Sequence, residues 1–249
     1  MIIIKSHDEI DKMREGGKIL SSALQKVIAL VRPGISSLEL DAKAYDFLLA
    51  NGGKPAFKNY QGYPSTLCVS INSEVVHGIP SQERILKDGD IVGLDLGLLY
   101  KGLYTDMAET VPVGEISKKA HKLITVTRKA LQKGISVIKP QNTLGDVGST
   151  IQSFVEKNNF GIVRSLVGHG VGKAIHEEPA VPNFGEAGTG IKLQEGMTLA
   201  LEPMVTEGDY PVKILDDKWT VVTQDGGLSA HFERTIVVTS NGSEILTPL

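Results

Sequence analysis

The chain has 249 residues and a formal net charge of −3, with 41% hydrophobic and 22% charged residues, as in an ordinary globular protein with a substantial core. Acidic and basic residues are interspersed, so no basic stripe or motif predicts direct binding to nucleic acid. The single cysteine, Cys68, excludes an internal disulfide and a cysteine-rich zinc site. The N-terminus lacks the apolar core of a signal peptide, and no apolar run is long enough to span a membrane. We therefore expect a cytoplasmic protein without membrane association.

Four helices are predicted from apolar residues at helical spacing. Residues 6–31 and 36–49 each open with a serine followed three residues later by glutamate, which is a capping box. An Arg-Pro-Gly sequence ends the first of them, and Asn-Gly-Gly ends the second. Residues 117–138 and 143–158 form a second such pair, the latter opening with threonine and aspartate in capping positions. Between the two pairs, TLCVSIN reads as a strand, and VVHGIP reads as a strand that ends in a loop at His77.

Residues 87–111 (KDGDIVGLDLGLLYKGLYTDMAETV) are predicted to form a β-hairpin. A turn of two or four residues, centred on Tyr100–Lys101 or on Lys101–Gly102, places Asp95 and Asp106 on the same face of the sheet. Two negative charges on a half-buried face are costly unless a cation lies between them, and a divalent metal ion is the usual one. A lone Asp in a strand is more often exposed to solvent or paired with Lys or Arg. The case for a metal therefore depends on further ligands.

An internal repeat points to those ligands. Pro33 and Pro140 each precede a predicted helix, a glycine precedes both Asp95 and Glu202 at the same distance, and the two prolines are as far apart in the chain as the two acids. We infer two similar helix-and-strand halves, approximately 1–115 and 116–249, related by a pseudo-twofold axis. They would form a single α/β (α+β) catalytic domain, residues 1–249, around a central sheet rich in antiparallel pairs. The second half also contains the predicted strand MTLALEPMV and a β-rich region over residues 219–239.

The second half offers three further ligand candidates. We expect Glu202 to be the counterpart of Asp95 in the repeat. We expect Glu233, in the strand-like run LSAHFERTIVVT, to be the counterpart of Asp106. His169 lies between glycines that allow close backbone approach and expose its imidazole. Four acids and one imidazole are too many for one ordinary catalytic ion, but they suit two divalent ions about 3.5–4 Å apart. Because no thiolate is offered, we expect manganese, iron(II), cobalt or zinc.

The order Asp, Asp, His, Glu, Glu, together with GHGVGKAIHEEP, LALEPM and HFERTIVVT, resembles the methionine aminopeptidases along essentially the whole chain. The resemblance is to the short, type I form, which has neither an N-terminal extension nor an inserted helical subdomain. It implies a pita-bread fold and a metalloaminopeptidase that removes the initiator methionine from nascent polypeptides. The reaction would be attack of metal-activated water on the first peptide bond, with a preference for small second residues.

The resemblance also implies a role for each ligand. Asp95 would bind one ion, His169 and Glu202 the other, and Asp106 and Glu233 would bridge both. The free α-amine of the substrate would be anchored at a metal, which makes the enzyme an exopeptidase. Glu202 would also carry a proton from the attacking water to the leaving amine.

Two further histidines and a methionine pocket follow from the resemblance. His176 would hydrogen-bond the substrate carbonyl, and His77 would lie near the scissile amide; the alternatives are a structural histidine and a loop histidine. An apolar slot for an unbranched thioether is expected to have soft or aromatic walls. Its predicted residues are Phe57, Tyr60, Tyr63, Cys68, His77, Ile175, His176 and Trp219. Relatives often carry cysteine at position 57 and an aromatic residue at position 175, so whether Phe57 lines the slot or packs behind it stays open.

The resemblance also implies a site for a monovalent cation. Backbone carbonyls of Asn72, Glu74 and Ser229 match positions that hold a monovalent cation in relatives. We expect a monomer that contacts the ribosome transiently. One alternative is an Xaa-Pro aminopeptidase or prolidase, which would normally add an N-terminal domain. The other is a catalytically silent binding protein of the same fold, which would have lost ligands.

Overall fold

The computed structural model describes residues 2–249, and its four helices lie close to the predicted ranges. Capping boxes start three of them, at Ser6, Ser36 and Thr143, which confirms those predicted starts. The helices are α1 (His7–Ile28), α2 (Ser37–Ala50), α3 (Lys118–Ser136) and α4 (Leu144–Lys157). The first helix ends three residues earlier than predicted, because a turn ahead of Pro33 follows Ile28.

A nine-stranded sheet forms the centre of the molecule, and all of its pairs are antiparallel. Its path is β1-β4-β5-β14-β9-β7-β8, with β2 joined to β4 and β15 joined to β14. The bounds are β1 (Lys54–Pro55), β2 (Leu67–Ile71), β4 (Ile91–Tyr100), β5 (Leu103–Pro112), β7 (Gly168–Gly170), β8 (Glu177–Val181), β9 (Thr198–Leu201), β14 (Glu233–Thr239) and β15 (Gly242–Ile245).

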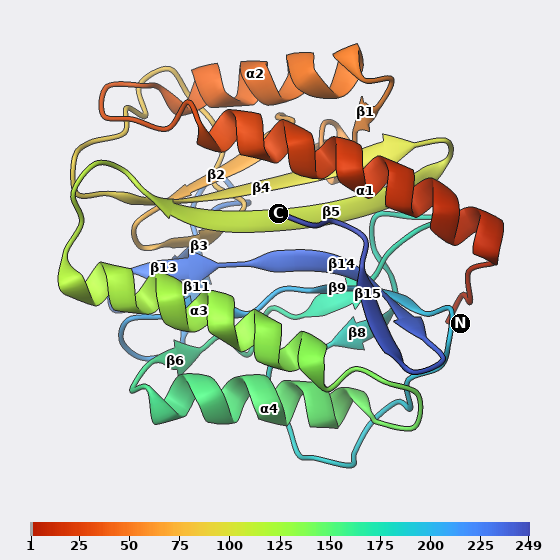
Figure 1. Cartoon of the computed structure of the whole chain (residues 1–249). Helices are drawn as coiled ribbons and strands as arrows, with labels where there is room; N and C mark the ends of the chain where they lie inside the picture. The colour runs from red at the N-terminus through yellow and green to blue at the C-terminus, as the bar shows by residue number, and fades with distance from the viewer. Residues whose placement is uncertain (1) are drawn as a thin grey trace.

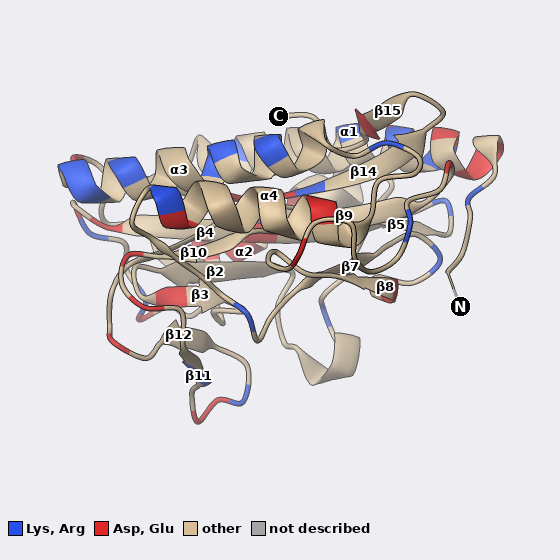
Figure 2. Cartoon of the chain, turned by 90° about the horizontal axis from the view of Figure 1, so that it is seen from below, with Lys and Arg blue, Asp and Glu red and all other residues tan. Residues whose placement is uncertain are grey.

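Two three-stranded sheets flank the central sheet. One has the order β13-β10-β6 and the other β11-β12-β3. Their strands are β3 (Glu74–Val76), β6 (Gly161–Ile162), β10 (Met204–Thr206), β11 (Val212–Ile214), β12 (Val221–Thr223) and β13 (Ser229–His231). In Figure 2, α1, α3 and α4 form a layer above the central sheet, while β11 and β12 lie on its opposite side. One face of the sheet is therefore covered by helices, and the other is left for loops and short strands.

The sequence repeat is visible in the backbone. Helix α4 follows α2 at the offset that separates Asp95 from Glu202, at both its first and its last residue, and β9 begins at that same offset from the start of β4. Even the isolated bridge between Ser36 and Ile85 has its equivalent in the second half, between Thr143 and Lys192. Each half has its own apolar core, one between α1, α2 and the strands β2 and β4, the other between α3, α4 and the strands β9 and β14. Figure 1 shows the two helix pairs one above the other along the sheet. The division of one catalytic domain into two halves stays a prediction.

Two predicted strands are wrong as continuous elements. The run MTLALEPMV is broken at Glu202–Pro203, so that β9 belongs to the central sheet and β10 to a small one. The run LSAHFERTIVVT breaks at Phe232, between β13 and β14. Proline has no N–H for a sheet ladder, which explains the first break. No helix among residues 2–249 combines the length and apolar character that crossing a bilayer requires.

Candidate metal centre and active site

The hairpin of β4 and β5 places two acids on one face, as predicted. The turn has two residues, Lys101 and Gly102, both with positive φ, and Tyr100 pairs with Leu103. Asp95 therefore faces Ala108, and Gly97 faces Asp106. Since side chains two apart along a strand share a face, both carboxylates project from the same side of the sheet.

Sheet register brings ligands from the second half onto the same face. Ala108 pairs with Asp95 on one side and with Glu233 of β14 on the other, so the two acids flank one methyl group. Further along β14, Thr235 pairs with Ala200 of β9, and Ala200 pairs with His169 of β7. Directly opposed residues share a face, so His169 projects on the same side as Glu233.

Glu202 completes the group from just beyond the end of β9. The strand break at Pro203 frees it from the ladder, and its Oε1 lies 3.5 Å from Nε2 of His169. One ligand atom each from Asp106, His169 and Glu233 lie within 4.8 Å of one another. The structure thus brings the five predicted metal ligands together, although they come from distant segments of the chain.

No Lys or Arg of residues 2–249 forms an ion pair with Asp95, Asp106 or Glu233. One carboxylate oxygen on each of the three is buried without a hydrogen-bond partner. Unsatisfied buried carboxylate oxygens are costly, so they indicate a ligand that the protein atoms do not supply.

Burial raises the pKa of every carboxyl group in the cluster. Burial raises the pKa of Asp95 to about 7. Burial, and then the neighbouring acids, raise the pKa values of Asp106, Glu202 and Glu233 well above their usual range. The cluster can hold all its negative charge near neutral pH only with cations among the carboxylates.

His169 is prepared to act as a neutral ligand. Its Nδ1 lies 2.9 Å from the carbonyl of Gly170, which assigns the proton to Nδ1 and leaves the Nε2 lone pair toward the carboxylates. Burial lowers the pKa of His169 to about 3, so the ring is neutral at physiological pH. Oxygen donors with one imidazole nitrogen suit divalent ions of intermediate or hard character. The residues therefore fit a divalent metal centre.

A pocket with a volume of about 170 Å³ opens above this cluster. Its floor consists of the four acids and the histidine just described. Its walls are mostly aromatic and comprise Phe57, Tyr60, Gln61, Tyr63, Cys68, His77, His176 and Trp219. Trp219 makes edge-on contacts with Tyr63 and His77, at centroid distances of 5.2 and 6.2 Å. The pocket is narrow, apolar on its walls and strongly polar at one end.

Phe57 lines this pocket, which resolves the choice left open by the sequence. The absence of a side chain at Gly97 allows this contact with the metal-site strand, because a Cβ there would lie 2.7 Å from Cε1 of Phe57. Ile175 is not among the lining residues. It is 2% exposed and packs in the same apolar cluster as Phe57 and Cys68, so it supports the wall from behind.

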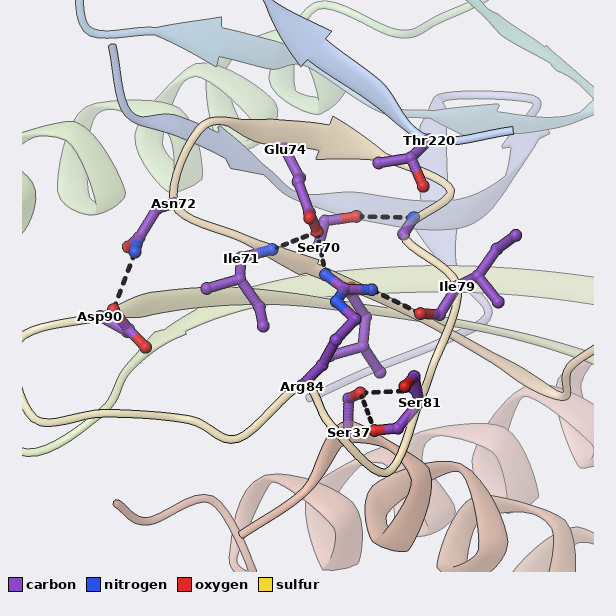
Figure 3. Close-up of polar contacts among 12 residues, drawn as sticks. Ser37, Ser70, Ile71, Asn72, Glu74, Ile79, Ser81, Arg84, Asp90 and Thr220 are labelled. Atoms are coloured by element: carbon purple, nitrogen blue, oxygen red, sulfur yellow. Dashed lines mark hydrogen bonds and ion pairs between the residues drawn. The ribbon is translucent and has the colours of Figure 1, made fainter. Parts of the chain in front are cut away.

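His77 lies at the end of β3 in a left-handed conformation, with φ +60°, which is uncommon for histidine. Figure 3 shows how the following loop is held: Arg84 donates to the carbonyl of Ile79 at 2.5 Å and pairs with Glu74, and Ser70 Oγ accepts the N–H of Gly78 at 3.3 Å. Burial lowers the pKa of His77 to about 4. These contacts hold the residues that follow His77, whose neutral imidazole lines the pocket.

His176 projects into the pocket from the loop that follows His169. The centroids of the two rings are 4.3 Å apart, and Nδ1 of His176 lies 3.0 Å from the hydroxyl of Tyr60. If the hydroxyl donates to Nδ1, the N–H at Nε2 is available to a substrate oxygen. Burial lowers the pKa of His176, which favours this neutral form.

Two residues near the site were missed from the sequence. Gln61 lies in the aromatic loop of residues 55–64, where nothing marked it. His231 is buried; its Nε2 has no hydrogen-bond partner and lies 3.7 Å from Oε2 of Glu202. Its position two residues before Glu233 was the available signal, since alternation along the chain favours the same face.

The three residues proposed for a monovalent cation lie on neighbouring segments. The carbonyl of Asn72 accepts the N–H of Ser229 at 2.8 Å, and β3, which contains Glu74, lies beside β13. The Glu74 side chain is directed away to Arg84 and the N–H of Ile71, so only its carbonyl is available. A cation at these carbonyls stays a prediction.

Comparisons with known proteins agree with this geometry. Residues 11–240 match metallopeptidase family M24. A methionine aminopeptidase of Clostridium perfringens is 51% identical over 247 residues, which is 99% of both chains. The crystal structure of methionine aminopeptidase from Thermotoga maritima superposes with a TM-score of 0.98 at 48% identity and covers all of both chains. A prolidase from Pyrococcus horikoshii has a TM-score of 0.78 at 28% identity, and the match covers only 64% of that protein. These likenesses confirm the predicted pita-bread fold.

Proposed function

The chain belongs to metallopeptidase family M24, and from this premise we propose that it is a metalloaminopeptidase that removes N-terminal methionine from polypeptides. The observation that carries the proposal is the cluster of buried, unpaired carboxylates at the end of a narrow aromatic pocket. A pocket closed at its floor admits the first side chain of a peptide and no more. The match to full-length methionine aminopeptidases favours this activity over that of a prolidase.

The centre uses divalent metal ions, and we propose that it holds two. Asp95 would bind one, His169 and Glu202 the other, and Asp106 and Glu233 would contact both. When bound, the ions would neutralise the carboxylates and supply Lewis acidity for peptide hydrolysis. Manganese, cobalt, iron(II) and zinc all suit the donor set, and the carbonyls of Asn72, Glu74 and Ser229 remain candidates for a monovalent cation.

The protein's own side chains have separate tasks in the proposed reaction. The Glu202 carboxylate accepts a proton from the attacking water and passes it to the leaving amine. His176 donates from Nε2 to the substrate carbonyl oxygen as that oxygen gains negative charge, while the Tyr60 hydroxyl holds its other nitrogen. We propose that His77, which lines the pocket in a left-handed backbone conformation, contacts the scissile amide.

Selectivity for methionine follows from the pocket walls. A flexible thioether packs well against aromatic rings, and Phe57, Tyr63 and Trp219 supply them. Cys68 adds a second sulfur at the wall. Because the first residue must lie between these walls and the metal centre, the second residue of the substrate is held close to the protein, and we propose a preference for small residues there.

Further features of the proposal concern the cellular setting. We infer that the substrates are nascent polypeptides met in the cytoplasm, that the protein acts as a monomer and that it contacts the ribosome transiently. The ribosome contact is testable by co-sedimentation of the protein with translating ribosomes.

Steady-state hydrolysis of Met-Gly-Met, Met-Leu, Met-Pro and Ala-Pro peptides with added manganese or cobalt tests the function. We expect cleavage of Met-Gly-Met, and slower cleavage when leucine follows methionine. Asp106→Asn provides the inactive control, since it keeps the shape but removes a charged ligand. Preference for the proline dipeptides would indicate a prolidase, and no turnover with any metal would indicate a silent binding protein.

A further inference from the structure

The segment ahead of α1 contains a buried lysine. The side chain of Lys5 is 1% exposed, and that of its ion-pair partner Glu177 is 4% exposed, the least exposed pair among residues 2–249. Lys5 also donates from Nζ to the carbonyl of Ile3 at 3.2 Å and from its backbone N–H to Gly196 at 2.9 Å. A lysine charge is rarely buried unless it is paired. The burial of Lys5 therefore depends on its ion pair with Glu177.

Glu177 uses its second oxygen to close a loop of the active site. Oε1 accepts the backbone N–H groups of Lys173 and Ala174, the latter at 2.9 Å. At the start of β8, the residue also pairs with Gly170 of β7. The Glu177 carboxylate therefore joins Lys173 and Ala174, inside the loop, to Lys5 of the N-terminal segment.

That loop connects His169 to His176, and Glu177 follows His176 directly in the chain. The aliphatic part of Lys5 also packs against the loop, because a Cβ at Gly172 would lie 2.4 Å from Cε of Lys5. Both the charge and the carbon chain of one lysine thus limit the positions that the loop can take.

We propose that the Lys5–Glu177 ion pair is a positioning device for His176. Lys5 does not contact the substrate; it holds the backbone from which the imidazole reaches the pocket. The inference rests on the proposed function, which assigns His176 to the substrate carbonyl. Displacing a catalytic group by about 1 Å can lower a rate by about 100-fold, so the pair affects catalysis from outside the pocket.

The same loop offers a matched control. Lys173 pairs with Glu9 of α1 at 2.8 Å, but the side chains are 52% and 24% exposed. Exposed ion pairs contribute little, because water and salt screen them. Lys173→Met therefore removes a charge and an ion pair from the loop without disturbing the buried connection.

The test compares Lys5→Met with Lys173→Met in the full, metal-loaded chain, using Met-Gly-Met. We expect Lys5→Met to lower kcat by about 30- to 100-fold with KM within about threefold, and Lys173→Met to change kcat by less than about twofold. Bound metal, counted by elemental analysis, should be unchanged in both. An unchanged kcat in Lys5→Met, or a loss of kcat that follows a loss of metal, would overturn the proposal.

A double variant covers the case in which Lys5→Met fails to fold because Glu177 is left buried without a partner. Lys5→Met with Glu177→Gln removes both charges, while the glutamine oxygen can still accept the loop amides. The link to the N-terminal segment is lost, so the same fall in kcat is expected. A folded double variant with the kcat of the natural protein would refute the assignment.

Hydrogen exchange gives a readout that does not depend on activity. In metal-free protein, the amides at positions 173 and 174 should exchange more than about tenfold faster in Lys5→Met than in Lys173→Met. If the natural protein fails to cleave Met-Gly-Met, the proposed function fails, yet faster exchange would still support the anchoring. Equal exchange in the two variants would reject it.

Discussion

The two halves of the molecule share a scaffold but present their acids differently. Asp95 and Asp106 lie inside the two ten-residue strands of a regular hairpin. In the second half, Glu202 lies beyond the end of β9 and ahead of Pro203, and Glu233 is the first residue of β14. The acids of the first half are therefore held within a sheet, whereas those of the second half lie at strand ends next to loops. The first half thus supplies only oxygen donors to the cluster, whereas the second half adds imidazole.

The largest expected effect concerns Asp106 and Glu233, one acid from each half. They are not equivalent in the repeat, contrary to the expectation from the sequence, because Met204 pairs with His231 as Gly97 pairs with Asp106. Asp106→Ala and Glu233→Ala should each abolish binding of two ions and lower kcat/KM by more than about a thousandfold, because each carboxylate is proposed to contact both ions. Calorimetric titration with manganese measures the stoichiometry. Two ions bound to either variant would contradict the assignment, and a loss confined to one variant would show that only that carboxylate contacts both ions.

The metal-free protein should become less stable as pH rises. The folded-state pKa of Asp95, about 7, lies above its ordinary value of 3.8, so between those values the folded chain retains a proton that the unfolded chain releases. The contribution of Asp95 to the free energy of unfolding is then fully present below pH 4 and is lost toward pH 8. This loss is on the order of 4 kcal/mol. Urea unfolding at pH 5 and pH 8 measures the loss. Asp95→Asn should reduce this loss, and a flat profile would show that burial does not raise the pKa of Asp95.

The counterpart of His176 in the first half is His77, because Ser70 pairs with Gly93 as His169 pairs with Ala200, and each histidine lies at the same distance beyond that pair. His176→Ala should lower kcat by about 100- to 1000-fold while the metal content stays unchanged, since its proposed partner is the substrate oxygen. Elemental analysis beside steady-state kinetics separates the two effects. A variant that is inactive only because it has lost metal would move His176 from the substrate to the metal centre.

The smallest effect is expected at the starts of α2 and α4, where the two halves have the same capping arrangement. Ser36→Ala and Thr143→Ala remove equivalent capping side chains from α2 and α4, each of which bonds to an N–H in the first turn. Each should cost about 1 kcal/mol of unfolding free energy without changing kcat. Urea unfolding of the two variants should give losses that agree within about 0.5 kcal/mol. A much larger loss at one cap would show that the two helices are held in different ways.

Local rules allowed the helix starts and the hairpin to be predicted. A capping box is complete within four residues, and the shared face of Asp95 and Asp106 follows from the turn and the alternation of side chains alone. The repeat extended this reasoning to Glu202, because an equal offset in the chain predicts an equal place in the scaffold.

Long-range packing limited the rest. The β-prone run around Pro203 gave no sign that its two ends join different sheets, since that choice depends on strands far away in the chain. His231 lies two residues before Glu233, but its proximity to Glu202 follows only from the fold. The buried role of Lys5 was equally hidden, because its partner lies 172 residues away.

The missing side chain at Gly97 has a consequence for any change in this enzyme. The ring of Phe57 rests on the backbone of the strand that carries Asp95, so selection of the side chain and metal binding share one piece of main chain. Even one added methyl group at this position would displace the ring of Phe57 or the strand beside Asp95. Substitutions at this position are therefore expected to change substrate range and metal affinity at the same time.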